Sequence, residues 1–271
     1  MTDTPRTVEA ATAERKEELR ESLQEIRDKV KASIQPGSAP TLVAVSKYKP
    51  ASDILACYEH GQLDFGENYV QELVDKAHAL PGDIRWHFIG TLQSNKAKIL
   101  ASIPNLFAVQ TLGSIKAASA LQNSLPNNRE SPLRVLLQVN TSGEDSKSGM
   151  PPLTNGSRLE AEPLVSLAKH IITECAGLRL EGLMTIGSLE QSLNASDSEE
   201  NTDFEKLKET RDILAKYLKE NYGQNAWGDS TGKLVLSMGM SSDFEAALKA
   251  GSDIVRVGTG IFGQRPKKTD A

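Results

Sequence analysis

Short apolar runs recur eight times along the chain, and most are followed by a turn signal and a longer segment with helical spacing. Strand followed by helix, repeated eight times, is the pattern of a parallel sheet that closes into a (β/α)8 barrel, the TIM-barrel fold. A doubly wound open sheet is the alternative. The apolar runs are residues 42–46, 63–66, 86–89, 106–110, 133–139, 182–186, 234–238 and 254–257. The helical patterns between them are clearest at residues 52–59, 70–79, 93–101, 114–125, 163–175, 203–220 and 242–250.

A further helical pattern precedes the first apolar run. Within residues 8–34, Leu19, Leu23, Ile26 and Val30 recur at intervals of three and four, the period of an amphipathic helix. Eight helices then accompany eight strands. The sequence therefore predicts an α/β protein whose barrel is preceded by an N-terminal helix.

The remaining segments leave no room for a second domain. The polar stretches 150–162 and 188–202 are rich in Ser, Asn, Pro and Glu, and they predict solvated, even disordered, loops rather than linkers. We expect one barrel domain over residues 1–271, with flexible tails at 1–7 and 266–271.

The charge balance favours a small molecule as the ligand. The 36 acidic residues outnumber the 31 basic ones and give a formal net charge of −5, whereas nucleic acids and anionic membranes require a basic face. The only cysteines, Cys57 and Cys175, are far apart, and the four histidines lack metal-ligand spacing, so no disulfide framework or metal site is expected. No apolar run approaches the roughly 20 residues that span a bilayer. We expect a cytoplasmic location and leave a mitochondrial one open.

Two loops near the end of the chain suit a phosphate group. In TIM barrels the loops after strands seven and eight often bind phosphate. Here the first of these loops carries Ser241 and Ser242, and the second carries Gly258 and Thr259, whose small size lets backbone N–H groups approach an anion. Ser242 has an equally good alternative role, because Ser242-Asp243-Phe244-Glu245 matches the capping box that begins a helix. The two roles are compatible.

The segment Gly258-Thr259-Gly260-Ile261-Phe262-Gly263 also matches the dinucleotide fingerprint GxGxxG. That motif needs a following helix, a second strand and an acidic residue roughly 20 positions later, and the sequence printed here has only eight residues after Gly263. We therefore reject dinucleotide binding.

Lys47 follows the first apolar run. Side-chain alternation places it on the same face as Val43 and Val45, so it points to the ligand-binding mouth if that face lines the barrel. A neutral lysine amine can form an imine, and partial burial or a nearby cation such as Lys49 would lower its pKa in that direction. For an isolated lysine, simple solvation is the commoner role.

Arg256 lies near the end of the eighth run, and alternation places it on the opposite face from Val255 and Val257. An inward-pointing arginine needs an acceptor, which a cofactor can provide. The alternative acceptor is Glu67. Among the histidines, only His87 could face the site, although packing is its simpler role.

Several ordered segments together resemble the YggS/PROSC family of pyridoxal phosphate homeostasis proteins, which is similar to the barrel domain of bacterial alanine racemase. The resemblance covers nearly the whole chain after the first helix. The segments that carry it are Ala44-Val45-Ser46-Lys47, Phe65-Gly66-Glu67-Asn68-Tyr69-Val70-Gln71-Glu72, His87-Phe88-Ile89-Gly90, Leu92-Gln93-Ser94-Asn95-Lys96, Ser146-Lys147-Ser148-Gly149, Met238-Gly239-Met240-Ser241-Ser242-Asp243 and Arg256-Val257-Gly258-Thr259.

The resemblance implies that the cofactor is pyridoxal 5′-phosphate (PLP), held as a Schiff base on Lys47. It also implies that Arg256 and Asn68 contact the cofactor, with Arg256 facing either the ring nitrogen or the phosphate. Lys147 could be a second, weaker PLP contact, although solvation is its simpler role. The residues expected to form the phosphate cradle are Ser241, Ser242, Gly258 and Thr259.

Members of this family are thought to buffer and deliver PLP, possible recipients being PLP-dependent apo-enzymes, and no defined catalytic activity is implied. Racemisation needs acid/base groups on both faces of the substrate, and the racemases recruit the second group from an additional domain and a partner subunit. Because no second domain is expected here, we expect a monomeric carrier. An amino-acid racemase or related PLP enzyme is one alternative. A cofactor-free Schiff-base lyase acting on a phosphorylated sugar is the other.

Overall fold

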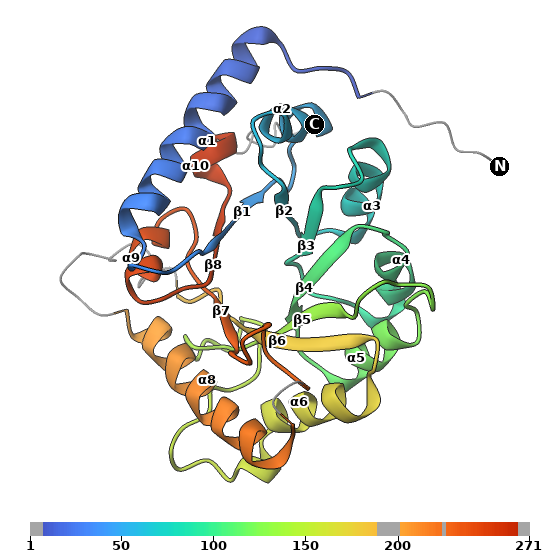
Figure 1. Cartoon of the computed structure of the whole chain (residues 1–271), viewed down its shortest axis with the longest axis vertical. Coiled ribbons are helices and arrows are strands. Elements are labelled where there is room, and N and C mark those ends of the chain that lie inside the picture. The colour runs from blue at the N-terminus through green and yellow to red at the C-terminus, as the bar shows by residue number, and fades with distance from the viewer. Residues whose placement is uncertain (1–7, 189–200, 224–225, 265–271) are drawn as a thin grey trace.

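Eight parallel strands form a closed barrel in the order β1 to β8 in a computed structural model that describes residues 8–188, 201–223 and 226–264. The barrel predicted from the apolar runs is therefore confirmed, and the open sheet is wrong. Figure 1 shows the strands inside a ring of helices. The strands are β1 (Thr41–Val45), β2 (Asp64–Glu67), β3 (Arg85–Phe88), β4 (Leu106–Leu112), β5 (Leu133–Gln138), β6 (Leu178–Met184), β7 (Val235–Ser237) and β8 (Ile254–Val257).

The predicted helices are present in the described part of the chain. No helix there is both long enough and apolar enough to cross a bilayer. The helices are α1 (Ala13–Ser33), α2 (Ala51–Glu59), α3 (Val70–Ala79), α4 (Ala97–Ala101), α5 (Ile115–Gln122), α6 (Pro163–Glu174), α8 (Thr202–Asn221), α9 (Phe244–Lys249) and α10 (Thr259–Phe262), with single 3-10 turns at η1 (Ser94–Lys96) and η2 (Leu159–Ala161).

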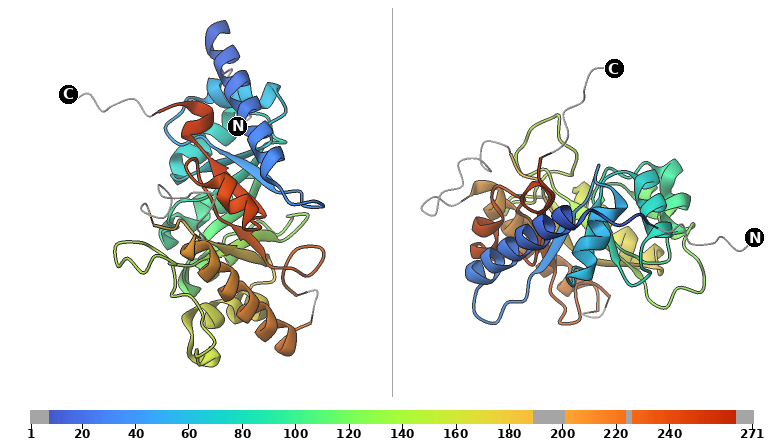
Figure 2. Two further views of the ribbon diagram at one scale, coloured as in Figure 1. Left: turned by 90° about the vertical axis from the view of Figure 1, so that its left-hand side faces the viewer. Right: turned by 90° about the horizontal axis from the view of Figure 1, so that it is seen from above.

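The N-terminal helix α1 covers the seam where the first and last strands meet. It packs against α2, α9 and α10, and the views in Figures 1 and 2 show it running along that side of the barrel. The apolar residues at helical spacing, Leu19, Leu23 and Ile26, are buried in this contact. The Thr12 hydroxyl accepts a hydrogen bond from the N–H of Arg15 and begins the helix.

Side-chain alternation separates two apolar layers. Val43 and Ile254 belong to a small cluster inside the barrel, with Leu136 and Met184, whereas Val255 joins the larger cluster between sheet and helices. Because Val43 pairs in register with Arg256, both side chains point to the barrel interior. The sequence-based orientation of Arg256 is therefore confirmed.

Element boundaries differ from the prediction where charged residues interrupt a pattern. Strand β6 begins at Leu178 rather than at residue 182. The prediction missed its first residues because Arg179 and Glu181 interrupt the apolar pattern there. Both side chains have hydrogen-bond partners: Arg179 donates to the carbonyl of Gly228, and Glu181 accepts from Arg134. The short helix α10 was not predicted.

The 150–162 segment packs against α8 through a few of its residues while most of the others are exposed, so the predicted solvated loop is confirmed and its predicted disorder is wrong. Leu153 is buried, and its N–H donates to the Thr210 hydroxyl at 3.1 Å. Tyr217 of α8 donates to Glu160 at 2.6 Å. Most of the 188–202 stretch and the two predicted tails lie outside the described residues.

The turn after β7 requires a glycine for two separate reasons, which a pair of variants can distinguish. Gly239 has φ 92°, and a Cβ there would lie 2.5 Å from the Cβ of Ala247, whereas Gly37 has φ 83° and open space around it. We expect Gly239→Ala to lower the free energy of unfolding by about 3 kcal/mol and Gly37→Ala by about 1 kcal/mol, measured by urea denaturation. Equal losses would contradict the packing argument.

Candidate functional site

A cavity of about 330 Å³ opens at the carboxyl ends of the strands, the end where TIM barrels bind their ligands. Its volume lies at the lower end of the usual range for small-molecule sites. All seven residues that the sequence predicted as site residues line it. The lining residues are Val45, Lys47, Asn68, Ile89, Met184, Ile186, Met240, Ser241, Ser242, Arg256, Gly258 and Thr259.

The loops after β7 and β8 meet on one side of this cavity. The N–H of Gly258 donates to the Ser241 hydroxyl at 3.1 Å and so ties the two loops together. A Cβ at Gly258 would lie 3.3 Å from the carbonyl oxygen of Val45, so glycine lets the second loop approach the end of β1. Ser242 and Thr259 are exposed at the cavity mouth. Three hydroxyl groups and the backbone of Gly258 therefore meet where the sequence predicted a phosphate.

The capping box proposed for Ser242 is wrong. Helix α9 starts at Phe244, and its N-cap residue is Asp243, whose carboxylate accepts from the N–H of Met240 at 2.6 Å. This hydrogen bond folds the turn back on itself before the helix begins. Ser242 stays outside the helix, and its side chain lines the cavity instead.

Lys47 lies in a tight turn just beyond β1 and is half-buried against the cavity. The next residue, Tyr48, has φ 63°, a conformation that costs a non-glycine residue about 1–3 kcal/mol and that the surroundings must stabilise. The N–H of Tyr48 donates to Glu72 Oε1 at 2.7 Å, and the N–H of Ser46 donates to the carbonyl of Gly66 at 3.0 Å.

A buried ion cluster supports this turn from below. Lys76 Nζ donates to Glu67 and Glu72 at 2.6 and 2.7 Å and to the carbonyl of Ser46 at 2.8 Å. The Ser46 hydroxyl also donates to Glu67, whose pKa burial raises above its ordinary value despite the nearby ammonium. Lys76 thus links α3 to the backbone beside Lys47.

Lys49 does not extend the cavity. Its ammonium donates to the carbonyl oxygens of Phe262, Gly263 and Gln264 at 2.9–3.1 Å, and burial lowers its pKa. An effect of Lys49 on the pKa of Lys47 stays a prediction.

Arg256 forms the floor of the cavity and is only 3% exposed. Its two terminal nitrogens donate to the Ser237 hydroxyl at 2.6 Å and to the carbonyl of Thr185 at 2.7 Å. Glu67, the alternative acceptor, is instead bound by Lys76, and none of the ion pairs found among the described residues includes Arg256. Burial lowers the pKa of Arg256 to about 10, although the charge of Asp243 opposes the shift. A buried cation therefore faces the cavity without a carboxylate partner.

The opposite wall is more apolar, with one polar exception. Asn68 Oδ1 is buried and has no hydrogen-bond partner in the described structure, although such an atom costs about 1–3 kcal/mol when left unsatisfied. Gly90 permits this arrangement, since a Cβ there would lie 1.9 Å from the backbone oxygen of Asn68. Asn68 itself lines the cavity.

A row of buried polar side chains beneath Arg256 escaped the sequence analysis. Ser237 and Gln110 continue the hydrogen bonding across the barrel to His87, which was expected to pack. The available signal was the presence of single polar residues within otherwise apolar strands. Alternation alone could not show that they meet.

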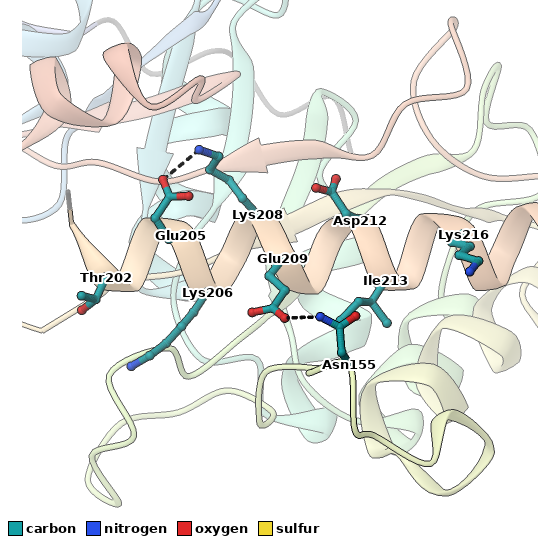
Figure 3. A pocket seen from close by; sticks show the side chains of 9 residues that line it. All are labelled: Asn155, Thr202, Glu205, Lys206, Lys208, Glu209, Asp212, Ile213 and Lys216. Carbon is teal, nitrogen blue, oxygen red and sulfur yellow. Dashed lines mark hydrogen bonds and ion pairs between the residues drawn. The ribbon is translucent and has the colours of Figure 1, made fainter.

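A second cavity, of about 750 Å³, lies on the outer surface against α8 and has no connection with these residues (Figure 3). Lysines and carboxylates both line it: Lys208 pairs with Glu205, and Asn155 donates to Glu209. Lys147 lies apart from both cavities and donates to Glu144 and to the carbonyl of Gly187, each at 2.7 Å.

Comparison with known proteins identifies the family. A family model for the alanine racemase N-terminal domain matches residues 16–266. The pyridoxal phosphate homeostasis protein of Schizosaccharomyces pombe is 43% identical over 241 residues, covering 89% of this chain and 90% of that protein. The chain belongs to the pyridoxal phosphate homeostasis protein family. The predicted family is therefore confirmed.

Solved structures agree with this assignment. PipY of Synechococcus elongatus, whose structure was solved with PLP bound, aligns with a TM-score of 0.65 and 27% identity over 90% of this chain and 100% of its own. Alanine racemase of Corynebacterium glutamicum aligns with a TM-score of 0.62 and 14% identity over 94% of this chain and 64% of its own. The likeness to the racemase shows the fold alone.

The burial of the Arg256 guanidinium should lower the stability of the cofactor-free protein. Because Arg256 stays charged at neutral pH, its desolvation lowers the free energy of unfolding of the cofactor-free protein by its full amount at pH 7. This loss of stability diminishes only as the pH rises through about 10. We expect Arg256→Met to raise the free energy of unfolding at pH 7 by about 1–3 kcal/mol in urea denaturation without cofactor.

Arg15→Met is the matched control, because Arg15 pairs with the buried carboxylate of Asp53 at 2.7 Å. Its loss should lower the free energy of unfolding. A clear loss of stability in Arg256→Met would show that the guanidinium is already compensated in the cofactor-free state.

Proposed function

We propose that this chain binds PLP in the cavity at the barrel mouth and takes part in PLP homeostasis as a reversible store that delivers the cofactor to apo-enzymes. The observation that carries the proposal is one cavity lined by a lysine, an arginine without a carboxylate partner and two small-residue loops. A relative of the same family is named for PLP homeostasis, and PipY binds PLP.

Each group of residues fits a different part of the cofactor. The Lys47 amine would link to the aldehyde as an imine, with loss of water. The cradle of Ser241, Ser242, Gly258 and Thr259 would bind the phosphate with hydroxyl and N–H donors. Arg256 would contact the ring nitrogen or the phosphate, and the buried Asn68 oxygen would accept from a polar group of the cofactor.

The same lining residues favour storage over catalysis. Bound PLP can withdraw electrons from an attached amino acid, but racemisation also needs proton transfer on both faces of the substrate. Among the described lining residues, Lys47 is the one strong acid/base group beside Arg256, which stays charged at pH 7; the rest are apolar, hydroxyl or amide side chains. Lys47 can return a proton to one face only.

A spectroscopic titration with two lysine variants tests cofactor binding. We expect a visible imine band when PLP is added to the purified protein, and no such band in Lys47→Ala, because that variant lacks the amine. Lys147→Ala, which removes a half-buried lysine that does not line the cavity, should keep the band and the PLP affinity. A wild-type protein that stays colourless would refute PLP binding and leave the Schiff-base lyase as the alternative, tested by borohydride trapping with phosphorylated sugars.

The racemase alternative predicts a different result for the same preparations. Incubation of the PLP-loaded protein with single L-amino acids, followed by chiral analysis, should show no sustained turnover. Sustained turnover that disappears in Lys47→Ala would contradict a purely storage role.

A further inference from the structure

A continuous row of hydrogen bonds, here called the polar column, crosses the barrel interior beneath the candidate site. It runs through five buried side chains on β8, β7, β4, β3 and β2, and the donor–acceptor distances are 2.6, 2.6, 2.9 and 3.0 Å. In order from the cavity they are Arg256, Ser237, Gln110, His87 and Asp64. A polar row of this kind replaces part of the apolar core that normally fills such a barrel.

The hydrogen bonds of the column have a single direction. Arg256 can only donate, so the Ser237 oxygen accepts from it, and the Ser237 hydroxyl hydrogen is left for Gln110 Oε1. The Gln110 amide nitrogen then donates to His87 Nδ1, and His87 Nε2–H donates to the Asp64 carboxylate. Every member therefore has one orientation.

The far end of the column is fixed by ionic contacts. Burial alone would raise the pKa of Asp64, but hydrogen bonds from Arg85 and His87 outweigh burial and hold that pKa below its ordinary value. Arg85 Nε donates to Asp64 Oδ1 at 2.8 Å. An ionised Asp64 accepts from His87 Nε2, which leaves His87 Nδ1 to accept from Gln110.

The near end determines where the guanidinium of Arg256 lies. Its protein acceptors are the Thr185 carbonyl and the Ser237 hydroxyl, and the hydrogen bond from Ser237 to Gln110 fixes the Ser237 rotamer with its oxygen toward Arg256. If Gln110 were lost, the Ser237 hydroxyl would lose the acceptor that fixes this rotamer, and its oxygen could turn away from Arg256.

We propose that Gln110 and His87 are positioning residues that act through Ser237 to hold Arg256 in the orientation that meets the cofactor. The inference rests on the proposed PLP binding. It also explains why strands β4 and β7 carry buried polar side chains that do not line the cavity.

The test compares Gln110→Leu, Ser237→Ala and the double variant with wild type. The readouts are the PLP dissociation constant, the pH midpoint of the visible band and the thermal unfolding of the cofactor-free protein. We expect each single variant to weaken PLP binding about tenfold and to shift the pH midpoint, because a displaced cation changes the charge felt by the bound cofactor. The double variant should lose no more affinity than either single variant, since both changes break the same link.

Thr210→Val is the matched control. Thr210 is fully buried on α8 and hydrogen-bonds to Leu153 and Lys206, outside the barrel interior. This variant should lower the unfolding temperature and leave the PLP dissociation constant and the pH midpoint unchanged.

Different results would refute the positioning role and the proposed PLP binding. A wild-type protein without a visible band refutes both. If the wild-type protein binds PLP but the column variants behave like Thr210→Val, the positioning role alone is refuted. The same holds if the affinity losses of the two single variants add in the double variant. If Gln110→Leu does not fold, Ser237→Ala decides the question through the same readouts.

Discussion

The pairing of β1 with β8 is the constraint on which the rest of the structure depends. It joins segments more than 200 residues apart in sequence, with Val43 opposite Arg256 and Ala44 opposite Val257. In an open sheet these strands would lie at different positions, and Lys47 would be remote from the loops after β7 and β8. Closure brings the lysine, the arginine and the two loops to one mouth, and α1 covers the seam that makes this possible.

The candidate site is obtained at a cost in stability. Among the described residues, Arg256 is buried without a carboxylate partner, Asn68 Oδ1 lacks a hydrogen-bond partner, and Tyr48 adopts a left-handed conformation. Such features are expected where a fold is arranged for a ligand rather than for its own stability. The Lys76 cluster stabilises the turn beside Lys47, and the polar column orients Arg256 through neutral groups without neutralising its charge.

Much of the fold could be predicted because each strand has an apolar run and each main helix has a regular apolar spacing. The predictions failed where those signals were interrupted: Arg179 and Glu181 concealed the start of β6, and α10 is a single turn. Ser242 matched a capping motif, but a hydrogen bond from the Met240 N–H to Asp243 moved the helix start. The positions of Lys47, Arg256 and the two phosphate loops followed from strand ends and alternation, whereas Asn68 was implied by the family resemblance. The polar column could not be predicted, because local patterns do not specify which inward side chains meet across a barrel.

The most direct test of the central claim is to locate the cofactor on the chain. The protein would be loaded with PLP, reduced with borohydride, digested and analysed by peptide mass spectrometry. The site geometry predicts a stoichiometric pyridoxyl-phosphate adduct on Lys47. An adduct mainly on Lys49, Lys147 or another lysine, with Lys47 unmodified, would contradict the assignment of the cavity as the PLP site.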